Sequence, residues 1–354
     1  MARISDLLSW PQILSALLAG EDLPIASADW AMGEVMSGDA SGAQVAGFLV
    51  ALEAKGVSVD EIVGFRDAIL ASATPLPIDP MALDIVGTGG DKVGTVNVST
   101  MSSVVAAATD VPVLKHGNRS VSSKSGASDV LAALGIDLSL SPEAIARVFS
   151  EVGIGFAFAP GFHPGFRHAA PVRAELGVPT VFNYLGPLCN PARPEASAMG
   201  VARRDLIPVI VGLFQTRGAT ALVLRGDDGL DELTTTGHSH VWEVSRGRVT
   251  EHDLDPRDLG IPRAQLSDLL GGNAEHNAAI ARRVFAGERG PVRDIVLLNT
   301  AAGIVSYDLA RDAGLLQTPI LERLADGIRR AEEALDSGAA AGLLERWVAA
   351  THAA

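Results

Sequence analysis

The stretch Asp84-Ile-Val-Gly-Thr-Gly-Gly-Asp91, followed by Lys92-Val-Gly-Thr-Val-Asn-Val-Ser-Thr100, decides how the rest of the chain is interpreted. Residues 82–86 form a short, mostly apolar run that ends in two β-branched residues, which suits a buried strand. Glycines follow this run, and small polar residues follow the glycines. The sequence therefore predicts a strand, a glycine-rich turn and the start of a helix, in this order.

The turn itself has the composition of a phosphate-binding loop. Gly87, Gly89 and Gly90 allow positive φ angles and a close approach of the backbone to a ligand. Residues 97–100 include side chains preferred at helix N-caps, and a helix N-terminus offers unpaired N–H groups and a positive dipole end. From the glycines alone, an ordinary tight turn remains an alternative. The stretch matches neither the P-loop, because no Gly-Lys-Ser/Thr closes it, nor the dinucleotide fingerprint.

Composition narrows the class of protein. The 354 residues carry a net charge of -14, which argues against a nucleic-acid partner and against docking on an anionic membrane. An anionic substrate would then need local cations or a metal ion. The single cysteine, Cys189, excludes an intramolecular disulfide and fits a reducing cytosol. The first residues lack a signal-peptide pattern, and no apolar run has the length of a membrane span.

The order of the predicted elements indicates two parts. Residues 1–74 contain only helical patterns, and the segment Thr74–Pro80 holds three prolines in seven residues, which marks a connector. Strands and helices alternate after it, which favours an α/β fold with a mostly parallel sheet covered on both sides. Strands are predicted at 111–114, 154–158, 197–201 and 220–224, a hairpin at 241–250, and helices at 125–134, 142–152, 205–216, 273–285 and 320–336.

A second loop, Lys115-His-Gly-Asn-Arg-Ser-Val-Ser-Ser-Lys-Ser-Gly-Ala127, also lies between a predicted strand and a predicted helix. It contains three cations and four serines in thirteen positions. Charge-assisted hydrogen bonds to an anion contribute about 1.5–3 kcal/mol each, and loops at the carboxyl ends of strands are where α/β sheets bind ligands. The stretch therefore predicts a second anion site, with a solvated polar loop as the alternative.

A third loop, Arg225-Gly-Asp-Asp-Gly-Leu-Asp-Glu232, again follows a predicted strand. Its adjacent carboxylates, Asp231 and Glu232, are ligands of the type that Mg²⁺ prefers, and Mg²⁺ commonly bridges to substrate phosphates. An acidic surface turn explains the pattern equally well when the loop is taken alone.

The segment Phe162-His-Pro-Gly-Phe-Arg-His-Ala-Ala-Pro-Val-Arg173 is weaker by itself. Arg173 falls on a predicted helix, where a lone arginine is usually a surface charge. His163 and His168 are more often structural than catalytic, and no zinc-like set of ligands accompanies them. Cys189 has no evident base partner, so we interpret it as a packing residue.

Taken together, these stretches resemble the anthranilate phosphoribosyltransferases of tryptophan biosynthesis over nearly the whole chain. The resemblance rests on six motifs in order, at 87–91, 97–100, 115–123, 163–173, 182–188 and 228–232. It implies a small N-terminal helical domain at 1–75, joined by 171–193, and a large α/β domain at 76–170 and 194–354. It also implies a homodimer formed through the helical domains, and Mg²⁺ as cofactor, with two ions.

The resemblance further implies the roles of individual residues. The phosphoribosyl diphosphate site would comprise Gly87, Gly90, Asp91, Thr95, Asn97, Val98, Ser99, Thr100, Lys115, His116, Gly117, Asn118, Arg119, Ser120, Val121, Ser122, Ser123 and Ala127. Anthranilate would contact Gly87, Asn118 and Arg173, and the metal would be held by Ser99, Asp231 and Glu232.

This chain departs from the family pattern at two places. Ala127 stands where many members have Ser, so a contact there would use the backbone, and Pro179 replaces a frequent Arg.

The implied reaction displaces diphosphate from C1 of the ribose by the amine of anthranilate. An aromatic amine is neutral near neutral pH, so no strong general base is required, and positioning supplies much of the rate. His116 and His163 are the candidates if a proton-transfer residue exists. Two alternatives remain: a pyrimidine nucleoside phosphorylase, which the Asp231–Glu232 pair disfavours, and a non-enzymatic nucleic-acid-binding relative, which the net charge of -14 disfavours.

Overall fold

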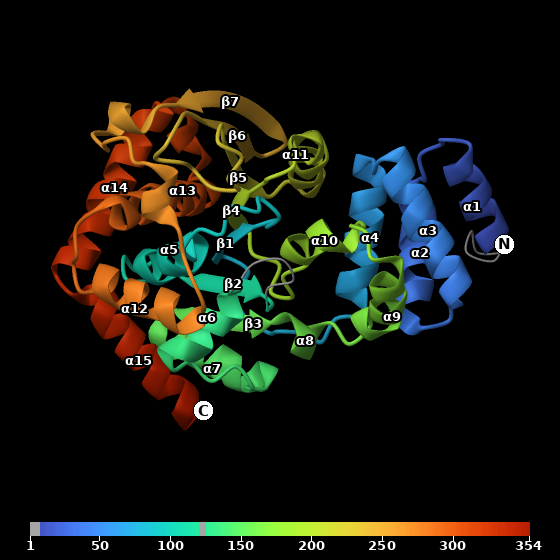
Figure 1. Ribbon diagram of the computed structural model, residues 1–354, viewed down its shortest axis with the longest axis horizontal. Coiled ribbons are helices and arrows are strands. Elements are labelled where there is room, and N and C mark those ends of the chain that lie inside the picture. Colours follow the sequence, from blue (N-terminus) through green and yellow to red (C-terminus); the bar gives the residue numbers. More distant parts are fainter. Residues whose placement is uncertain (1–7, 120–124) are drawn as a thin grey trace.

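The computed structural model describes residues 8–119 and 125–354. Its first part is a bundle of four helices, α1 (Trp10–Leu18), α2 (Ile25–Ser37), α3 (Gly42–Lys55) and α4 (Val59–Ala71), which lies to one side of the molecule (Figure 1). Capping boxes begin two of them: Ser41 caps α3 with Gln44, and Ser58 caps α4 with Glu61. The predicted helical start of the chain is thereby confirmed for the described residues.

The second part is built on one sheet of seven strands in the order β3-β2-β1-β4-β5-β6-β7. The strands are β1 (Leu83–Gly87), β2 (Val113–Gly117), β3 (Ile154–Phe158), β4 (Ala196–Gly200), β5 (Thr220–Gly226), β6 (Ser239–Ser245) and β7 (Arg248–Leu254). The first five are parallel and the last two form the predicted antiparallel hairpin, so the mostly parallel α/β sheet is confirmed. Strand order reverses beside β1, which has β2 on one side and β4 on the other.

Helices cover both faces of this sheet (Figure 1). On one face, α5 (Val98–Ala107) and α13 (Pro291–Arg311) pack against the strands, and the same apolar core extends outward to α12 (Ala274–Phe285), α14 (Ile320–Asp336) and α15 (Ala339–Ala353). The other face packs against α11 (Ile207–Arg217), and its apolar core continues into the four-helix bundle. Helices α6 (Ala127–Leu134) and α7 (Pro142–Val152) lie along the chain between β2 and β3. Successive side chains of a strand point to opposite faces of the sheet. Ala198 therefore belongs to the apolar core on the first face, and Met199 belongs to the core on the second face.

The chain returns to the bundle between β3 and β4, through α8 (Ala159–Phe162), α9 (Phe166–Leu176) and α10 (Phe182–Leu185). Ala169, Phe182 and Leu185 are buried in the same apolar cluster as the bundle residues. This packing supports a helical domain completed by the returning segment, although the predicted domain boundaries themselves stay a prediction. None of the helices among the described residues is long and apolar enough to span a membrane.

Candidate active site

The loops that the sequence singles out follow β1, β2 and β5 at the carboxyl edge of the sheet. This edge, next to the point where strand order reverses, is where open α/β sheets bind ligands. The loop after β1 leads into the N-terminus of α5, the loop after β2 leads toward α6, and the loop after β5 carries Asp231 and Glu232. The cationic loop is described only in part, because Ser120, Val121, Ser122, Ser123 and Lys124 lie outside the described residues.

The glycine turn and the acidic loop are in direct contact. Gly89 and Gly90 have the predicted positive φ angles, 68° and 88°. Gly87 is not among the residues with positive φ, so the expectation for it was wrong; it is required instead because a Cβ there would lie 2.1 Å from Asp231 Oδ2. The backbone N–H of Gly89 donates to the same carboxylate oxygen at 2.8 Å. A Cβ at Gly200 would lie 1.5 Å from the carbonyl oxygen of Asp231.

The acidic pair occupies an environment that fits a cation. Glu232 Oε2 is buried and has no hydrogen-bond partner among the described residues. Burial and the neighbouring Asp231 and Asp91 raise the pKa of Glu232 well above its usual value, and burial raises the pKa of Asp231 to about 6. The described residues contain no group of three His, Cys, Asp or Glu side chains able to hold a metal. A metal here would take its remaining ligands from water or substrate oxygens, as Mg²⁺ commonly does.

Lys115 is a buried structural cation. Its Nζ donates to the carbonyl of Ile85 and to Ser99 Oγ, the latter at 3.2 Å, and so it joins β2, β1 and α5. Burial lowers the pKa of Lys115 to about 8, while the charges of Asp84 and Glu232 oppose this shift. These hydrogen bonds therefore hold the ammonium group beneath the loops, where it does not reach into solvent.

The N-terminus of α5 remains open toward the site. Asn97 occupies the predicted N-cap position, but its side chain makes no capping hydrogen bond. Its Nδ2 donates to the carbonyl of Ser125 at 3.3 Å, and its Oδ1 accepts a hydrogen bond from Asn277 Nδ2 at 2.8 Å. Thr95 forms an isolated bridge with Leu270. The Val98 N–H donates to the Val96 carbonyl, so the N–H groups of Ser99 and Thr100 are the ones that an anion could use, because Asn97 does not cap the helix.

The start of the cationic loop is ordered locally. Asn118 and Arg119 directly follow β2, and Asn118 Oδ1 accepts a hydrogen bond from the Arg119 N–H at 2.7 Å. Ala127 is the first residue of α6. These positions place the two ends of the loop at the same edge of the sheet as the glycine turn.

Arg173 lies on α9, away from the strands themselves. Its Nη2 donates to Asn183 Oδ1 at 3.4 Å, and its guanidinium lies 5.3 Å from the centre of the Phe182 ring. Both contacts lie within the returning segment and join α9 to α10. No hydrogen bond or ring contact among the described residues joins Arg173 to Asn118 or Gly87, so a shared contact of these three residues with anthranilate stays a prediction.

The two candidate proton-transfer residues are a buried pair. The rings of His116 and His163 lie 5.1 Å apart, edge to face. Burial lowers the pKa of His116 to about 3 and that of His163 to about 4, and the proximity of His163 contributes to the shift in His116. Both rings are therefore neutral and weakly basic near neutral pH, which argues against either one as the general base.

Three asparagines that support the site loops were not expected from the sequence. Asn183 contacts Arg173, Asn277 contacts Asn97, and Asn299 on α13 binds the backbone of Leu233. An isolated asparagine in a sequence does not indicate which distant residue its carboxamide will contact, so the sequence alone could not identify these three residues.

Comparisons with known proteins agree with this architecture. Residues 11–73 match the helical bundle domain of a glycosyl transferase family, and residues 79–341 match the a/b domain of that family. The fold and the strand-end loops thus define a two-domain glycosyl transferase.

Similar proteins narrow the class. An anthranilate phosphoribosyltransferase of Leifsonia xyli is 67% identical over 98% of this chain and 100% of its own, and that of Clavibacter michiganensis is 61% identical over 98% and 99%. The crystal structure of the Thermus thermophilus enzyme superposes with a TM-score of 0.87 at 42% identity, covering 96% of this chain and 99% of that one. The chain belongs to the anthranilate phosphoribosyltransferase family, which confirms the resemblance and gives no support to the phosphorylase or nucleic-acid-binding alternatives.

Proposed function

We propose that this chain transfers the 5-phosphoribosyl group from phosphoribosyl diphosphate to the amine of anthranilate. The products are N-(5-phosphoribosyl)anthranilate and diphosphate, the second step of tryptophan synthesis from chorismate. Family membership supports the reaction. A Saccharomyces cerevisiae relative, with a TM-score of 0.86 at 28% identity over 98% of both chains, was solved with PRPP and Mg, and another structure of that enzyme contains 4-fluoroanthranilate.

The observation that carries the proposal is the contact between the glycine turn and the acidic pair. It holds the Asp231 carboxylate against the Gly89 N–H, next to a buried Glu232 carboxylate oxygen that has no hydrogen-bond partner among the described residues. The proposed diphosphate-sugar site comprises Gly87, Gly90, Asp91, Thr95, Asn97, Val98, Ser99, Thr100, Ala127 and the segment 115–123, whose first three residues belong to β2 and not to the predicted loop. Turn N–H groups and the open N-terminus of α5 would bind the phosphate oxygens.

Ser99, Asp231 and Glu232 would hold Mg²⁺, and we propose two ions. The buried carboxylate oxygen without a partner and the raised pKa of both acids fit a cation. When bound, Mg²⁺ neutralises charge that develops on the departing diphosphate. Of the three residues, Ser99 is already oriented by its hydrogen bond with Lys115.

The remaining work of the chain is positioning. Anthranilate would contact Gly87, Asn118 and Arg173, and the planar guanidinium of Arg173 can bind a carboxylate through two parallel hydrogen bonds. The aromatic amine attacks C1 in its neutral form as the bond from C1 to the diphosphate breaks. Because both buried histidines are weakly basic, the amine proton would pass to water or to the released diphosphate. Bringing the helical bundle and the sheet together around both substrates would align the amine with C1.

We further propose a homodimer formed through the helical bundle. Leu18 on α1 is 80% exposed and Val50 on α3 is 48% exposed, so apolar side chains remain uncovered on this part of the chain. The two-domain division at 1–75 with 171–193 belongs to the same proposal. A cytosolic location stays a prediction.

The test is the loss of anthranilate fluorescence on mixing with phosphoribosyl diphosphate, with and without Mg²⁺. We expect a magnesium-dependent loss in the wild type. Asp231→Asn combined with Glu232→Gln should abolish the magnesium-dependent rate, because neutral amides replace both charged ligands. Unchanged dependence on Mg²⁺ in the double variant would remove these residues from the metal site, and no fluorescence loss in the wild type would refute the proposed reaction.

A further inference from the structure

Asn299 forms a bidentate contact with the backbone of the acidic loop. Its Oδ1 accepts a hydrogen bond from the Leu233 N–H at 2.9 Å, and its Nδ2 donates to the Leu233 carbonyl at 2.8 Å and to the Ile295 carbonyl at 2.9 Å. Asn299 is 3% exposed, and these three hydrogen bonds use its acceptor and its donor group. Leu233 directly follows Glu232, so this contact fixes the chain on one side of the proposed metal ligand.

The residue on the other side of Glu232 is fixed independently. Gly87 and Gly200 leave room only for the backbone and carboxylate of Asp231, and Gly89 donates a hydrogen bond to that carboxylate at 2.8 Å. The ends of β1 and β4 therefore hold Asp231, while α13 holds Leu233. Glu232 lies between these two residues, and its Oε2 is buried without a hydrogen-bond partner among the described residues.

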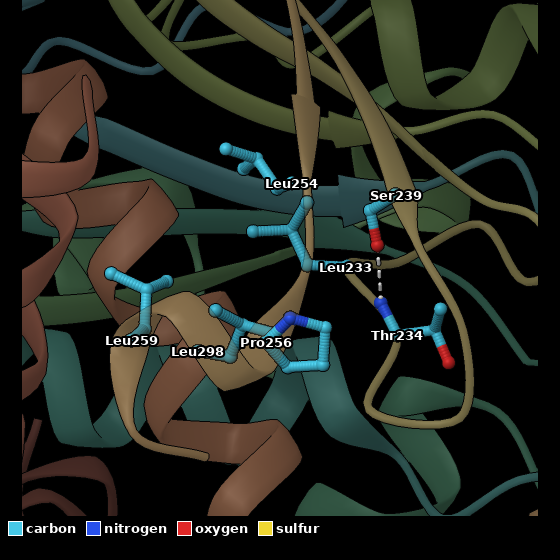
Figure 2. A pocket seen from close by; sticks show the side chains of 7 residues that line it. All are labelled: Leu233, Thr234, Ser239, Leu254, Pro256, Leu259 and Leu298. Carbon is cyan, nitrogen blue, oxygen red and sulfur yellow. Dashed lines mark hydrogen bonds between the residues drawn. The ribbon is translucent and has the colours of Figure 1, made fainter. Parts of the chain in front are cut away.

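Packing behind the loop leaves little freedom for another arrangement. Figure 2 shows Leu233 in a small space that is also lined by Leu254, Pro256, Leu259 and Leu298. Thr234 and Ser239 also line this space, and the N–H of Thr234 donates to Ser239 Oγ at 2.9 Å (Figure 2). Side-chain packing holds Leu233 in place, but it does not set the direction of its peptide groups. The carboxamide of Asn299 binds the peptide groups on both sides of Leu233, and Ser239 binds the second of these from its N–H end.

We propose that Asn299 is a positioning residue that orients the Glu232 carboxylate for the metal by fixing the peptide groups of Leu233. The inference rests on the proposed function of this edge of the sheet. Groups that orient metal ligands without touching the metal commonly contribute ten- to a hundredfold to metal affinity. A buried asparagine could also serve stability alone, so the test needs a control that loses comparable hydrogen bonds elsewhere.

Ser306 provides that control within the same helix. It lies about two turns further along α13 and is fully buried. Its Oγ donates to the carbonyl of Ser197 at 2.8 Å and accepts a hydrogen bond from the Ser197 N–H at 3.2 Å. Ser197 lies near the start of β4, away from the carboxyl edge. Ser306→Ala therefore removes a matched backbone contact that does not reach the acidic loop.

The experiment compares Asn299→Ala with Ser306→Ala in three measurements on the full chain. We expect both variants to lower the midpoint of thermal unfolding. Only Asn299→Ala should raise the Mg²⁺ midpoint of the transfer rate, by roughly ten- to a hundredfold. Hydrogen–deuterium exchange of the segment 230–235 without metal should speed up in Asn299→Ala and remain unchanged in Ser306→Ala.

Two results would overturn the inference. One is an Asn299→Ala protein that exchanges faster at 230–235 but keeps the wild-type Mg²⁺ midpoint. The other is an equal shift of that midpoint in Ser306→Ala. If Asn299→Ala does not fold, Asn299→Asp, which keeps an acceptor for the Leu233 N–H and loses the donors, takes its place.

Failure of the proposed function would be recognised separately. In that case the wild type itself shows no transfer, and Mn²⁺ binding followed by electron paramagnetic resonance carries the test. Weaker Mn²⁺ binding in Asn299→Ala than in Ser306→Ala would then support the positioning role without any turnover. Equal binding in the two variants, or no Mn²⁺ binding by the wild type, would refute it.

Discussion

Gly200→Ala tests the geometry of the site without touching any residue proposed to bind a ligand. Gly200 ends β4, and a Cβ built there would lie 1.5 Å from the Asp231 carbonyl oxygen and 2.3 Å from its carbonyl carbon. Ordinary van der Waals contact begins at 3.4 Å. The acidic loop would therefore have to retreat from β4 by about 2 Å, since backbone atoms cannot rotate away as a flexible side chain does.

The size of the effect follows from that displacement. Overpacking in a well-packed core typically costs about 1–3 kcal/mol, which a folded protein of this size can tolerate. The chemistry tolerates less, because a misplacement of about 1 Å at a reacting centre can cost roughly a hundredfold in rate. We expect Gly200→Ala to remain folded and to lose at least about a hundredfold in kcat/KM.

The assay is the fluorescence loss of anthranilate under steady-state conditions, with unfolding by urea measured in parallel. Gly33→Ala is the matched control: it adds the same methyl group in the middle of α2, where nothing lies within 4 Å of the new Cβ. In a helix interior this change should be neutral or slightly stabilising. A folded Gly200→Ala enzyme with nearly wild-type kcat/KM would show that the acidic loop need not be held against β4.

Two further predictions concern charge. Arg173→Ala should raise the KM for anthranilate far more than the KM for phosphoribosyl diphosphate, because it removes the proposed carboxylate contact; equal effects on both KM values would contradict this role. The pKa of Asp231 is raised to about 6 and that of Glu232 well above its usual value, so the rate at subsaturating Mg²⁺ should fall as pH drops through about 6, because protonated carboxylates bind metal poorly. The stability of the metal-free protein should change in the opposite direction. A carboxyl whose pKa is higher in the folded chain than in the unfolded chain takes up a proton on folding. The free energy of unfolding should therefore rise as the pH falls from about 7 toward 4. The measurement subtracts the free energy of unfolding of the double variant (Asp231→Asn with Glu232→Gln) from that of the wild type at each pH. A difference that rises with pH over this range would refute the assigned pKa shifts.

Several helices and strands could be predicted from the residues of their own segments alone. The helices at 142–152 and 320–336 and the strand at 154–158 begin and end where the sequence predicted. Their caps or periodic apolar faces lie within the segments themselves, so no distant contact was needed. Helix α13, Pro291–Arg311, was not predicted, because every residue from Ile295 to Tyr307 is buried. A helix buried on all sides lacks the polar face that produces a recognisable period.

The same distinction separates what was predictable in the site from what was not. Residue types at each strand end indicated the glycine turn and the acidic pair. Their contact could not be predicted, since Gly89 and Asp231 are 142 positions apart and Leu233 and Asn299 are 66 apart. Gly87 illustrates the point: its glycine was assigned to backbone freedom, whereas the structure requires it as space for a side chain from another loop.

An acidic protein that binds a polyanion needs a local source of positive charge, and the structure limits where it can come from. The net charge of -14 repels a diphosphate at long range. Lys115, the buried cation at this edge, is already engaged by Ile85 and Ser99. The acids at 231 and 232 would increase the repulsion if they faced the diphosphate without a cation. With a cation between them and the phosphates, the same carboxylates become part of the attraction. Burial is the main reason why the pKa of both acids is raised while the metal is absent, and the charge of Asp231 adds to the shift in Glu232. The restraints on Asp231 and Leu233 are then explained, because two carboxylates that repel each other stay in a metal-ready arrangement only if the backbone on both sides is held.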